Sequence, residues 1–163
     1  MRAIAIGLML SFATAAAWAQ RPAPPTKTFS SAEDVAGLLA KAKADHKDGQ
    51  PTVIERILTL APYGVNLEYR TAVGPAAVHP REAELFYVLD GSGTLTTGGK
   101  LIDAKDTNPD NITGTGIDGG SSRHMSKGDV AIVPENTPHW FSSIDGTIVL
   151  MSMHVPRSAG GTH

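Results

Sequence analysis

The sequence predicts an all-β fold, an antiparallel barrel of two packed sheets preceded by a short helix. From residue 52 onward, short runs of β-branched and aliphatic residues are separated by Gly, Pro and Asp turn signals. Residues 65–69 alternate apolar and polar side chains, as a half-buried strand does. Helical periodicity is limited to one stretch before residue 50. Many short strands with frequent turns are typical of a sandwich or a barrel.

Residues 1–19 have the features of a signal peptide. Arg2 precedes an apolar run from Ala3 to Ala17, and Ala17-Trp18-Ala19 is a small-x-small cleavage site. We expect cleavage before Gln20 and a periplasmic or secreted mature protein. A membrane anchor is disfavoured because the run is short for a hydrocarbon core of about 30 Å. The sequence has no cysteine, which excludes a lipidated cysteine and disulfides.

The composition restricts the class of partner. The mature chain of roughly 144 residues is long enough for one domain. Its net charge of −2 gives no basic footprint for nucleic acid. After the signal peptide, no segment is apolar enough to cross a membrane. The remaining partners are a small-molecule ligand or substrate and further copies of the chain.

A proline-rich tether and a helix precede the barrel. Residues 20–29 form the tether, expected to be extended and mobile. Ser30-Ser31-Ala32-Glu33 resembles a capping box with Ser30 at the N-cap and Glu33 at N3. The region 30–50 is therefore assigned to a helix over about 31–46 and a linker. Its narrow apolar stripe predicts packing on the outside of the body, through Val35, Leu38, Leu39 and Ala42.

The barrel is assigned to residues 51–157, followed by a flexible tail over 158–163. Leu85 to Leu89 is apolar at every position, so both faces of this strand should be covered. Asp145-Gly146 is interpreted as a hairpin turn. Residues 101–127 are rich in turn formers and are interpreted as an insertion ordered by turns, either a lid or a surface elaboration. The predicted strands are 53–60, 65–69, 85–89, 94–97, 130–133 and 147–155.

Two distant segments supply potential metal ligands. They contribute His79, Glu84 and His139, two imidazoles and a carboxylate that can hold a divalent ion and leave positions open for a substrate. His79 lies five residues before Glu84, an odd offset that one straight strand cannot place on one face. Pro80 therefore predicts a break that puts the two side chains on neighbouring strands.

The same two segments resemble the two sequence motifs of the cupin superfamily. The resemblance covers about residues 52–156 and implies a jelly roll, the double-stranded β-helix of that family. It does not imply one activity, because cupins include dioxygenases, isomerases, lyases, storage proteins and sensors. The matching positions are His79, Glu84 and Gly91 in the first motif and Gly128, Pro134 and His139 in the second.

Three positions depart from the motifs. Ala77 stands where the first motif has its first histidine, Asn136 replaces a glycine and Ser143 replaces an asparagine. The resemblance then implies a metal held by the remaining trio, competent for Fe(II), Mn(II), Zn(II) or Ni(II) but weaker than a four-ligand site. His154 or His124 could supply the missing fourth ligand.

Each of the other polar residues near the motifs could have one of two roles. Glu82 shares its side with Glu84 and could replace it as ligand or act as a base. Arg81 could pair a substrate carboxylate or be solvated. Glu68 and Arg70 face either water or the barrel lumen. The catalytic candidates are therefore Glu82, Glu84 and Arg81.

Two classes of function follow. The first is a metal-dependent enzyme of lyase, isomerase or oxygenase type that acts on a small organic molecule. The second is a non-catalytic small-molecule-binding protein with a reduced or absent metal site, which Ala77 favours. Only one face of Leu85 to Leu89 can point into a barrel, and the other needs a sheet, the N-terminal helix or a second subunit to cover it. Among these covers, a second subunit is expected, which makes the protein a homodimer.

Overall fold

The computed structural model describes residues 25–157. The predicted signal peptide and C-terminal tail lie outside this range. Within it, most of the chain is antiparallel β-structure with one short helix, which confirms the predicted fold class. No helix in the described range is long and apolar enough to span a membrane. The elements are α1 (Ala32–Asp45), β1 (Thr52–Leu60), β2 (Tyr63–Arg70), β3 (Ala76–Val78), β4 (Glu82–Thr97), β5 (Lys100–Ile102), β6 (Lys105–Asn108), β7 (Asn111–Gly114), β8 (Gly116–Asp118), β9 (Ser121–Ser126), β10 (Val130–Val133) and β11 (His139–Pro156).

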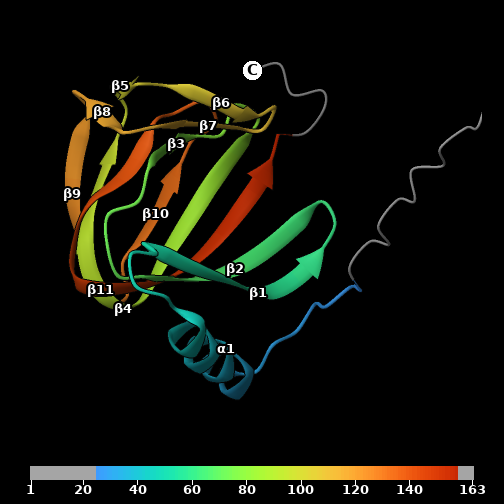
Figure 1. Cartoon of the computed structure of the whole chain (residues 1–163). Coiled ribbons are helices and arrows are strands. Elements are labelled where there is room, and N and C mark those ends of the chain that lie inside the picture. The colour runs from blue at the N-terminus through green and yellow to red at the C-terminus, as the bar shows by residue number, and fades with distance from the viewer. Residues whose placement is uncertain (1–24, 158–163) are drawn as a thin grey trace, which may run out of the picture.

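Two long strands organise the barrel. β4 and β11 pair along most of their length and bend with the wall (Figure 1). β2 and β1 continue the sheet beyond one end of β11, while β3, β7 and β6 continue it from the other end. β9 and β10 pair with β4. Because each long strand takes part in both walls, residues far apart in the sequence reach one end of the lumen.

The hairpin predicted at Asp145-Gly146 is wrong, because β11 is one bulged strand. The register with β4 shifts between Ile144 and Ile148 and then resumes. Pairing continues because β4 is also one strand, joining the predicted runs 85–89 and 94–97. Gly91 permits the bulge, since it has φ +74° and a Cβ there would overlap the Thr147 carbonyl.

The segment 101–127, predicted to be ordered by turns rather than by helix, has no helix but contains strands as well as turns. β9 pairs with β4 over 92–97 and belongs to the barrel wall. β6 and β7 extend the main sheet from β3, and β5 pairs with β8 in a second, two-stranded sheet; all four lie at the top of Figure 1. The sequence hides β9 because Met125 is its only buried residue. A strand without an apolar face lacks the alternation by which strands are predicted.

The helix covers the outer face of β1 and β2, as predicted (Figure 1). Its N-cap is Ser31, one residue later than predicted, and Asp34 rather than Glu33 completes the capping box. Both serines can cap, and the start at Ala32 turns the apolar stripe toward the sheet. Lys27 exchanges two backbone hydrogen bonds of 2.8 Å with Thr59, so this part of the tether is attached to β1 rather than mobile.

Two apolar clusters flank the main sheet. Phe86 and Val88 belong to the cluster inside the barrel. Leu89, from the same strand, packs outside against the cluster beneath the helix. Each fully buried side chain of this size contributes about 1.5–3 kcal/mol relative to exposure. The two clusters explain why this run is apolar on both faces and hold β4 firmly beside the polar end of the lumen.

Candidate metal centre

Four polar side chains meet at one end of the barrel. His79 follows β3, and Pro80-Arg81 separates it from β4, which carries Glu84. The predicted break at Pro80 is therefore confirmed. His139 begins β11, and His154 lies near its other end, directly opposite Glu84 in the register. The curvature of β11 brings its two ends to the same carboxylate.

The Glu84 carboxylate is the centre of this group. Its Oε2 lies 3.3 Å from Nε2 of His79 and 3.0 Å from Nε2 of His139. Its Oε1 lies 3.4 Å from Nε2 of His154. Neighbouring ligand atoms on one ion, each bonded at about 2.1 Å, are roughly 3 Å apart at right angles. The spacing therefore suits a common divalent ion.

Backbone carbonyls fix the proton positions of two of the imidazoles. Nδ1 of His79 lies 3.3 Å from the Asp110 carbonyl, and Nδ1 of His139 lies 3.2 Å from the Thr137 carbonyl. A carbonyl oxygen can only accept, so each Nδ1 carries a proton and donates it. In the neutral ring, Nε2 then presents a lone pair to the Glu84 carboxylate. The lone pair and the carboxylate repel each other unless Nε2 is protonated or a cation lies between the two groups, as at histidine metal sites.

The electrostatics of Glu84 and His79 agree with this geometry. Burial raises the pKa of Glu84, but the hydrogen bonds from His139 and His79 outweigh it and hold the pKa well below its ordinary range. Burial lowers the pKa of His79, but the Glu84 carboxylate more than compensates and raises it. Without a metal, the buried carboxylate thus depends on protonated imidazole.

His154 is a more prominent ligand candidate in the structure than in the sequence. One ligand atom from each of His79, Glu84 and His154 lies within 4.8 Å of the others, whereas the sequence placed His139 in this trio. Nδ1 of His154 is 3.0 Å from Oε2 of Glu82, yet its alignment is poor and this buried atom makes no hydrogen bond. Only the register of β11 on β4, absent from the motifs, brings His154 here.

The other candidates fall in different places. Ala77 pairs with His139 and so shares its side of the sheet. His124 is exposed and contacts Asp145 at 2.9 Å. It lies on β9 opposite Thr94, ten residues along β4 from Glu84. Arg81 is exposed and its guanidinium is paired with Asp110.

Glu68 and Arg70 face the lumen. Glu68 is only 4% exposed, accepts from Arg70 at 2.6 and 2.9 Å, and accepts from Ser152 at 2.5 Å. Arg70 also stacks on the Phe141 ring, 5.1 Å from its centroid. This second buried carboxylate is fully paired within the protein.

Two polar cavities open beside the imidazoles. One, of about 390 Å³, is lined by the β1–β2 hairpin. The other, of about 480 Å³, is lined by the β6–β7 hairpin and His79. Both hairpins extend toward the same end of the barrel (Figure 1). Glu82 and His154 line both cavities, so small molecules can approach the centre from either side.

Asn136 supports His79 from a third direction. It has φ +55°, a conformation that asparagine tolerates better than most residues, and it occupies the position of a motif glycine. Its backbone N–H donates to the His79 carbonyl at 2.8 Å. The substitution therefore retains the loop conformation that holds His79.

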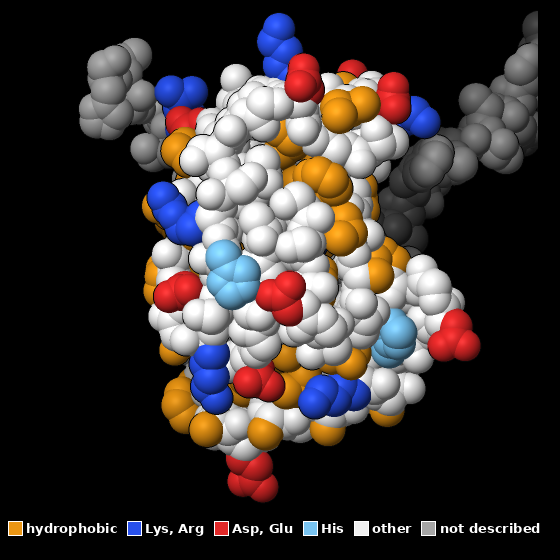
Figure 2. All heavy atoms as spheres, turned by 90° about the vertical axis from the view of Figure 1, so that its left-hand side faces the viewer, with side chains coloured by type: hydrophobic (Ala, Val, Ile, Leu, Met, Phe, Trp, Pro, Cys, Tyr) orange, Lys and Arg blue, Asp and Glu red, His pale blue; other side chains and the backbone are white. Residues whose placement is uncertain are grey.

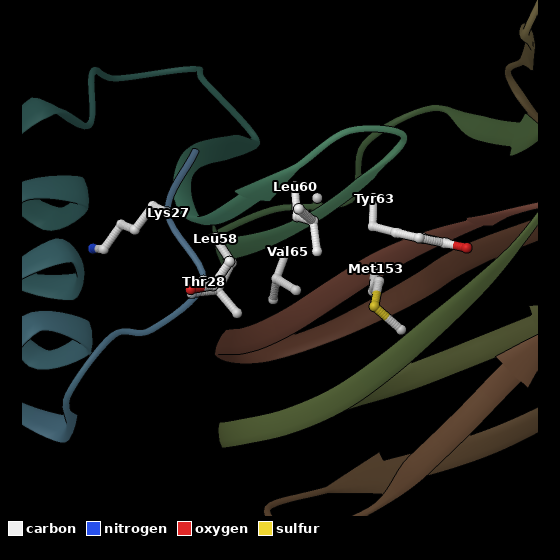
Figure 3. A pocket seen from close by; sticks show the side chains of 8 residues that line it. Lys27, Thr28, Leu58, Leu60, Tyr63, Val65 and Met153 are labelled. Atoms are coloured by element: carbon white, nitrogen blue, oxygen red, sulfur yellow. The ribbon is translucent and has the colours of Figure 1, made fainter. Parts of the chain in front are cut away.

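An apolar groove of about 260 Å³ lies on the outer face of the sheet, away from the imidazoles. Leu58, Val65 and Met153 line it beside the segment that carries Lys27 and Thr28 (Figure 3). Elsewhere, the face in Figure 2 shows positive and negative side chains interspersed, without a patch of one sign.

Comparisons with known proteins agree with the fold. The profile of the Cupin family matches residues 54–159. No curated protein sequence matches the chain. Three solved structures of low identity resemble it, and at such identities the likeness shows the fold alone. They are TT1209 from Thermus thermophilus (TM-score 0.51, 13% identity, 73% of this chain and 94% of the other), KdgF from Halomonas sp. (0.50, 16%, 69% and 86%) and the Cnp3 cupin domain from Schizosaccharomyces pombe (0.50, 14%, 71% and 72%).

Proposed function

The chain belongs to the cupin family, and we propose that it is a metal-dependent enzyme acting on a small organic molecule. One observation carries the proposal: three imidazoles face one buried carboxylate, and two of them are held with Nε2 toward it. A carboxylate needed only for folding would have permanent donors instead. The two adjoining polar cavities give a substrate access.

The residues that would hold the ion are Glu84, His79 and His139 from the motifs, with His154 as a fourth. Imidazole and carboxylate ligands suit Fe(II), Mn(II), Zn(II) and Ni(II). Bound there, a divalent ion would supply Lewis-acid polarisation of a substrate oxygen. His154 thus offers the ligand that the alanine at position 77 cannot supply.

Glu82 is the best-placed group for moving a proton. Its side chain is 28% exposed and lines both cavities. Its Oε2 can accept a proton from a substrate in either cavity, while His154 contacts the same oxygen at 3.0 Å. Such a base suits lyase, isomerase or oxygenase chemistry.

Arg81 acts at the rim rather than in the cavities. Its guanidinium pairs with Asp110, and the Asp110 carbonyl accepts from His79. Through this contact Arg81 holds the β6–β7 hairpin against the metal centre. We therefore assign Arg81 a positioning role.

A non-catalytic binding protein is the second candidate. The observation that favours it is Ala77, which lies beside His139 but offers no ligand. Such a protein would hold a small molecule in the same cavities without turning it over. His154 favours the enzyme, because it restores a third imidazole.

Turnover by the metal-loaded protein distinguishes the candidates. We would screen small organic acids, sugars and aromatics by mass spectrometry, with Glu84→Gln and Glu82→Gln as matched controls. The enzyme predicts product from the parent protein and at least a hundredfold less from Glu82→Gln with its metal retained. Ligand binding without any product would favour the second candidate.

We also propose that the protein is a homodimer. Val130 and Ile132 on β10 are 62% and 63% exposed. They pair with Tyr87 and Leu85 of β4, which extend the same outer face. A second copy would remove these side chains from water. Sedimentation should give a dimer that Ile132→Glu dissociates, and a monomer at micromolar concentration would contradict this assignment.

Export completes the proposed function. Its support is the sequence of residues 1–19, which precede the described range. N-terminal sequencing of the protein expressed with its natural N-terminus should begin at Gln20. An intact Met1 in a cytosolic fraction would contradict export.

A further inference from the structure

We propose that the cavity between the metal centre and the β1–β2 hairpin binds the carboxylate of a small anionic substrate, with Arg56 as its anchor. This inference rests on the proposed function and names its substrate class. The cavity of about 390 Å³ is lined by Arg56, Thr59, Asn66, Glu82 and His154, among others. Its size suits a small metabolite rather than a polymer.

The structure places the Arg56 guanidinium on the lumen side of the sheet. Arg56 pairs with Asn66 in the register of β1 on β2, so the two side chains share a face. A Cβ at Gly64 would overlap the guanidinium, which therefore lies over the Gly64 backbone. Gly64 is the register partner of His154. The positive charge is thus one strand away from the proposed ligand His154.

Arg56 is not committed to another residue of the protein. Within residues 25–157, Arg70, Arg81 and Arg157 each contact a carboxylate, whereas Arg56, like the exposed Arg123, makes no such pair. An unpaired arginine is usually just solvated. This one lines a concave polar cavity beside potential metal ligands, where its planar fork of donors suits a carboxylate.

The charges of the cavity favour an anion once the metal is bound. Glu82 lines the cavity from β4, Glu84 contacts His154 of the same lining, and a divalent ion would offset both carboxylates. With its histidine ligands neutral, Arg56 then supplies the net positive charge. Asn66 and Thr59 add uncharged hydrogen-bonding groups to the lining. A substrate with one carboxylate on Arg56 and a second carboxylate toward the ion fits this distribution.

The choice of Arg56 also follows from the position of Arg81. Arg81 lies between the motif ligands His79 and Glu84 and was the sequence candidate for a substrate carboxylate. Its guanidinium is engaged by Asp110 on the far side of His79. Arg56 has no motif around it and reaches the cavity only because β1 lies next to β2.

The test uses calorimetric titration of the metal-loaded protein with malonate, succinate, glutarate and adipate, each compared with its monoamide. At least one dicarboxylate should bind about tenfold more tightly than its monoamide, since one charge-assisted contact is worth about this much. Arg56→Gln should erase that preference while its metal content stays unchanged. Gly64→Ala should weaken binding similarly, because the new Cβ displaces the guanidinium and leaves the charge.

The matched control is Lys127→Gln, which removes an exposed cation that does not line the cavity. It should bind all probes as the parent does. Equal affinities for acid and amide, or an unchanged preference in Arg56→Gln, would overturn the assignment of Arg56 while leaving the metal centre intact. Failure of the parent protein to retain any metal would instead overturn the proposed function, and this inference with it.

Discussion

Two buried carboxylates in the same lumen have opposite surroundings. Glu68 is 4% exposed and Glu84 is 5% exposed, and they lie on the two strands that flank β11. Glu68 accepts hydrogen bonds from a guanidinium and a hydroxyl. Glu84 instead faces three imidazoles. The two carboxylates are therefore equally buried but have different partners.

The difference separates a structural pair from a binding site. Arg70 stays charged at all relevant pH values, so Glu68 is neutralised permanently. His79 and His139, whose Nδ1 protons are donated to carbonyls, satisfy Glu84 only when their rings are doubly protonated, or when an ion lies between them and the carboxylate. Burying a charge with such conditional partners costs stability. This arrangement supports the proposed cation site.

The largest expected effect comes from breaking the structural pair. Glu68→Ala leaves the half-buried Arg70 and the buried Ser152 without their acceptor. We expect a loss of about 3 kcal/mol in the free energy of unfolding, measured by urea denaturation of the metal-free protein. Glu135→Ala, which removes a partner of the exposed Arg157, should cost less than about 1 kcal/mol. Equal losses would refute the distinction.

His154→Ala should act on metal affinity instead. Removing one imidazole from the four-residue set should weaken metal binding by about a hundredfold, because each ligand bond contributes strongly to affinity. Titration against a competing chelator measures this change. His124→Ala is the control, since His124 contacts only Asp145 among the described acids. If both variants bind metal alike, His154 is not a ligand.

Glu82→Gln should have a smaller effect on metal binding. Glu82 contacts Nδ1 of His154 at 3.0 Å, and residues that orient a ligand typically change metal affinity by about tenfold to a hundredfold. We expect the lower end, because the contact lacks good hydrogen-bond alignment. The same chelator titration checks it. A loss as large as in His154→Ala would make Glu82 a ligand itself.

The pH dependence of stability should reverse when metal is removed. The lowered pKa of Glu84 gives stability above its ordinary value of 4.5, which is lost as pH falls through the folded value. The raised pKa of His79 gives stability that is complete below 6.5 and lost as pH rises through the folded value. The metal-free protein should therefore be more stable at about pH 5.5 than at about pH 8.

The metal-loaded protein should show the opposite trend, because metal binding requires deprotonated imidazole. Thermal unfolding of both forms at the two pH values measures the contrast. His79→Gln should flatten the decline of the metal-free protein toward high pH. Parallel profiles for the two forms would contradict a role of these imidazoles in metal binding.

The sequence was sufficient for the fold class because its strongest signals are local. The alternation in β2, the apolar run of β4 and the stripe of α1 each follow from side-chain periodicity. Prediction from the sequence failed for elements whose structure depends on which strands pair. Asp145-Gly146 is a good hairpin turn in isolation, yet β4 continues beside both halves of β11. β9 has one buried apolar residue, Met125, and so has no periodic signal.

The candidate site divides in the same way. His79, Glu84 and His139 could be selected from their motif spacing, and the structure brings both imidazoles to the Glu84 carboxylate. His154 and Arg56 could not be ranked, because only strand register brings them to the same end of the lumen. Arg81 was selected for its place in the chain, but Asp110, from a hairpin 29 residues later, engages it.

The most direct test is the metal content of the protein purified without added metal, compared with that of Glu84→Gln. The substitution keeps the shape of the side chain and removes the charge that three imidazoles face. We expect a stoichiometric divalent ion in the parent protein and none in the variant, while Glu68→Gln retains the ion. A parent protein that contains no metal, or a variant that retains as much metal as the parent, would contradict the account.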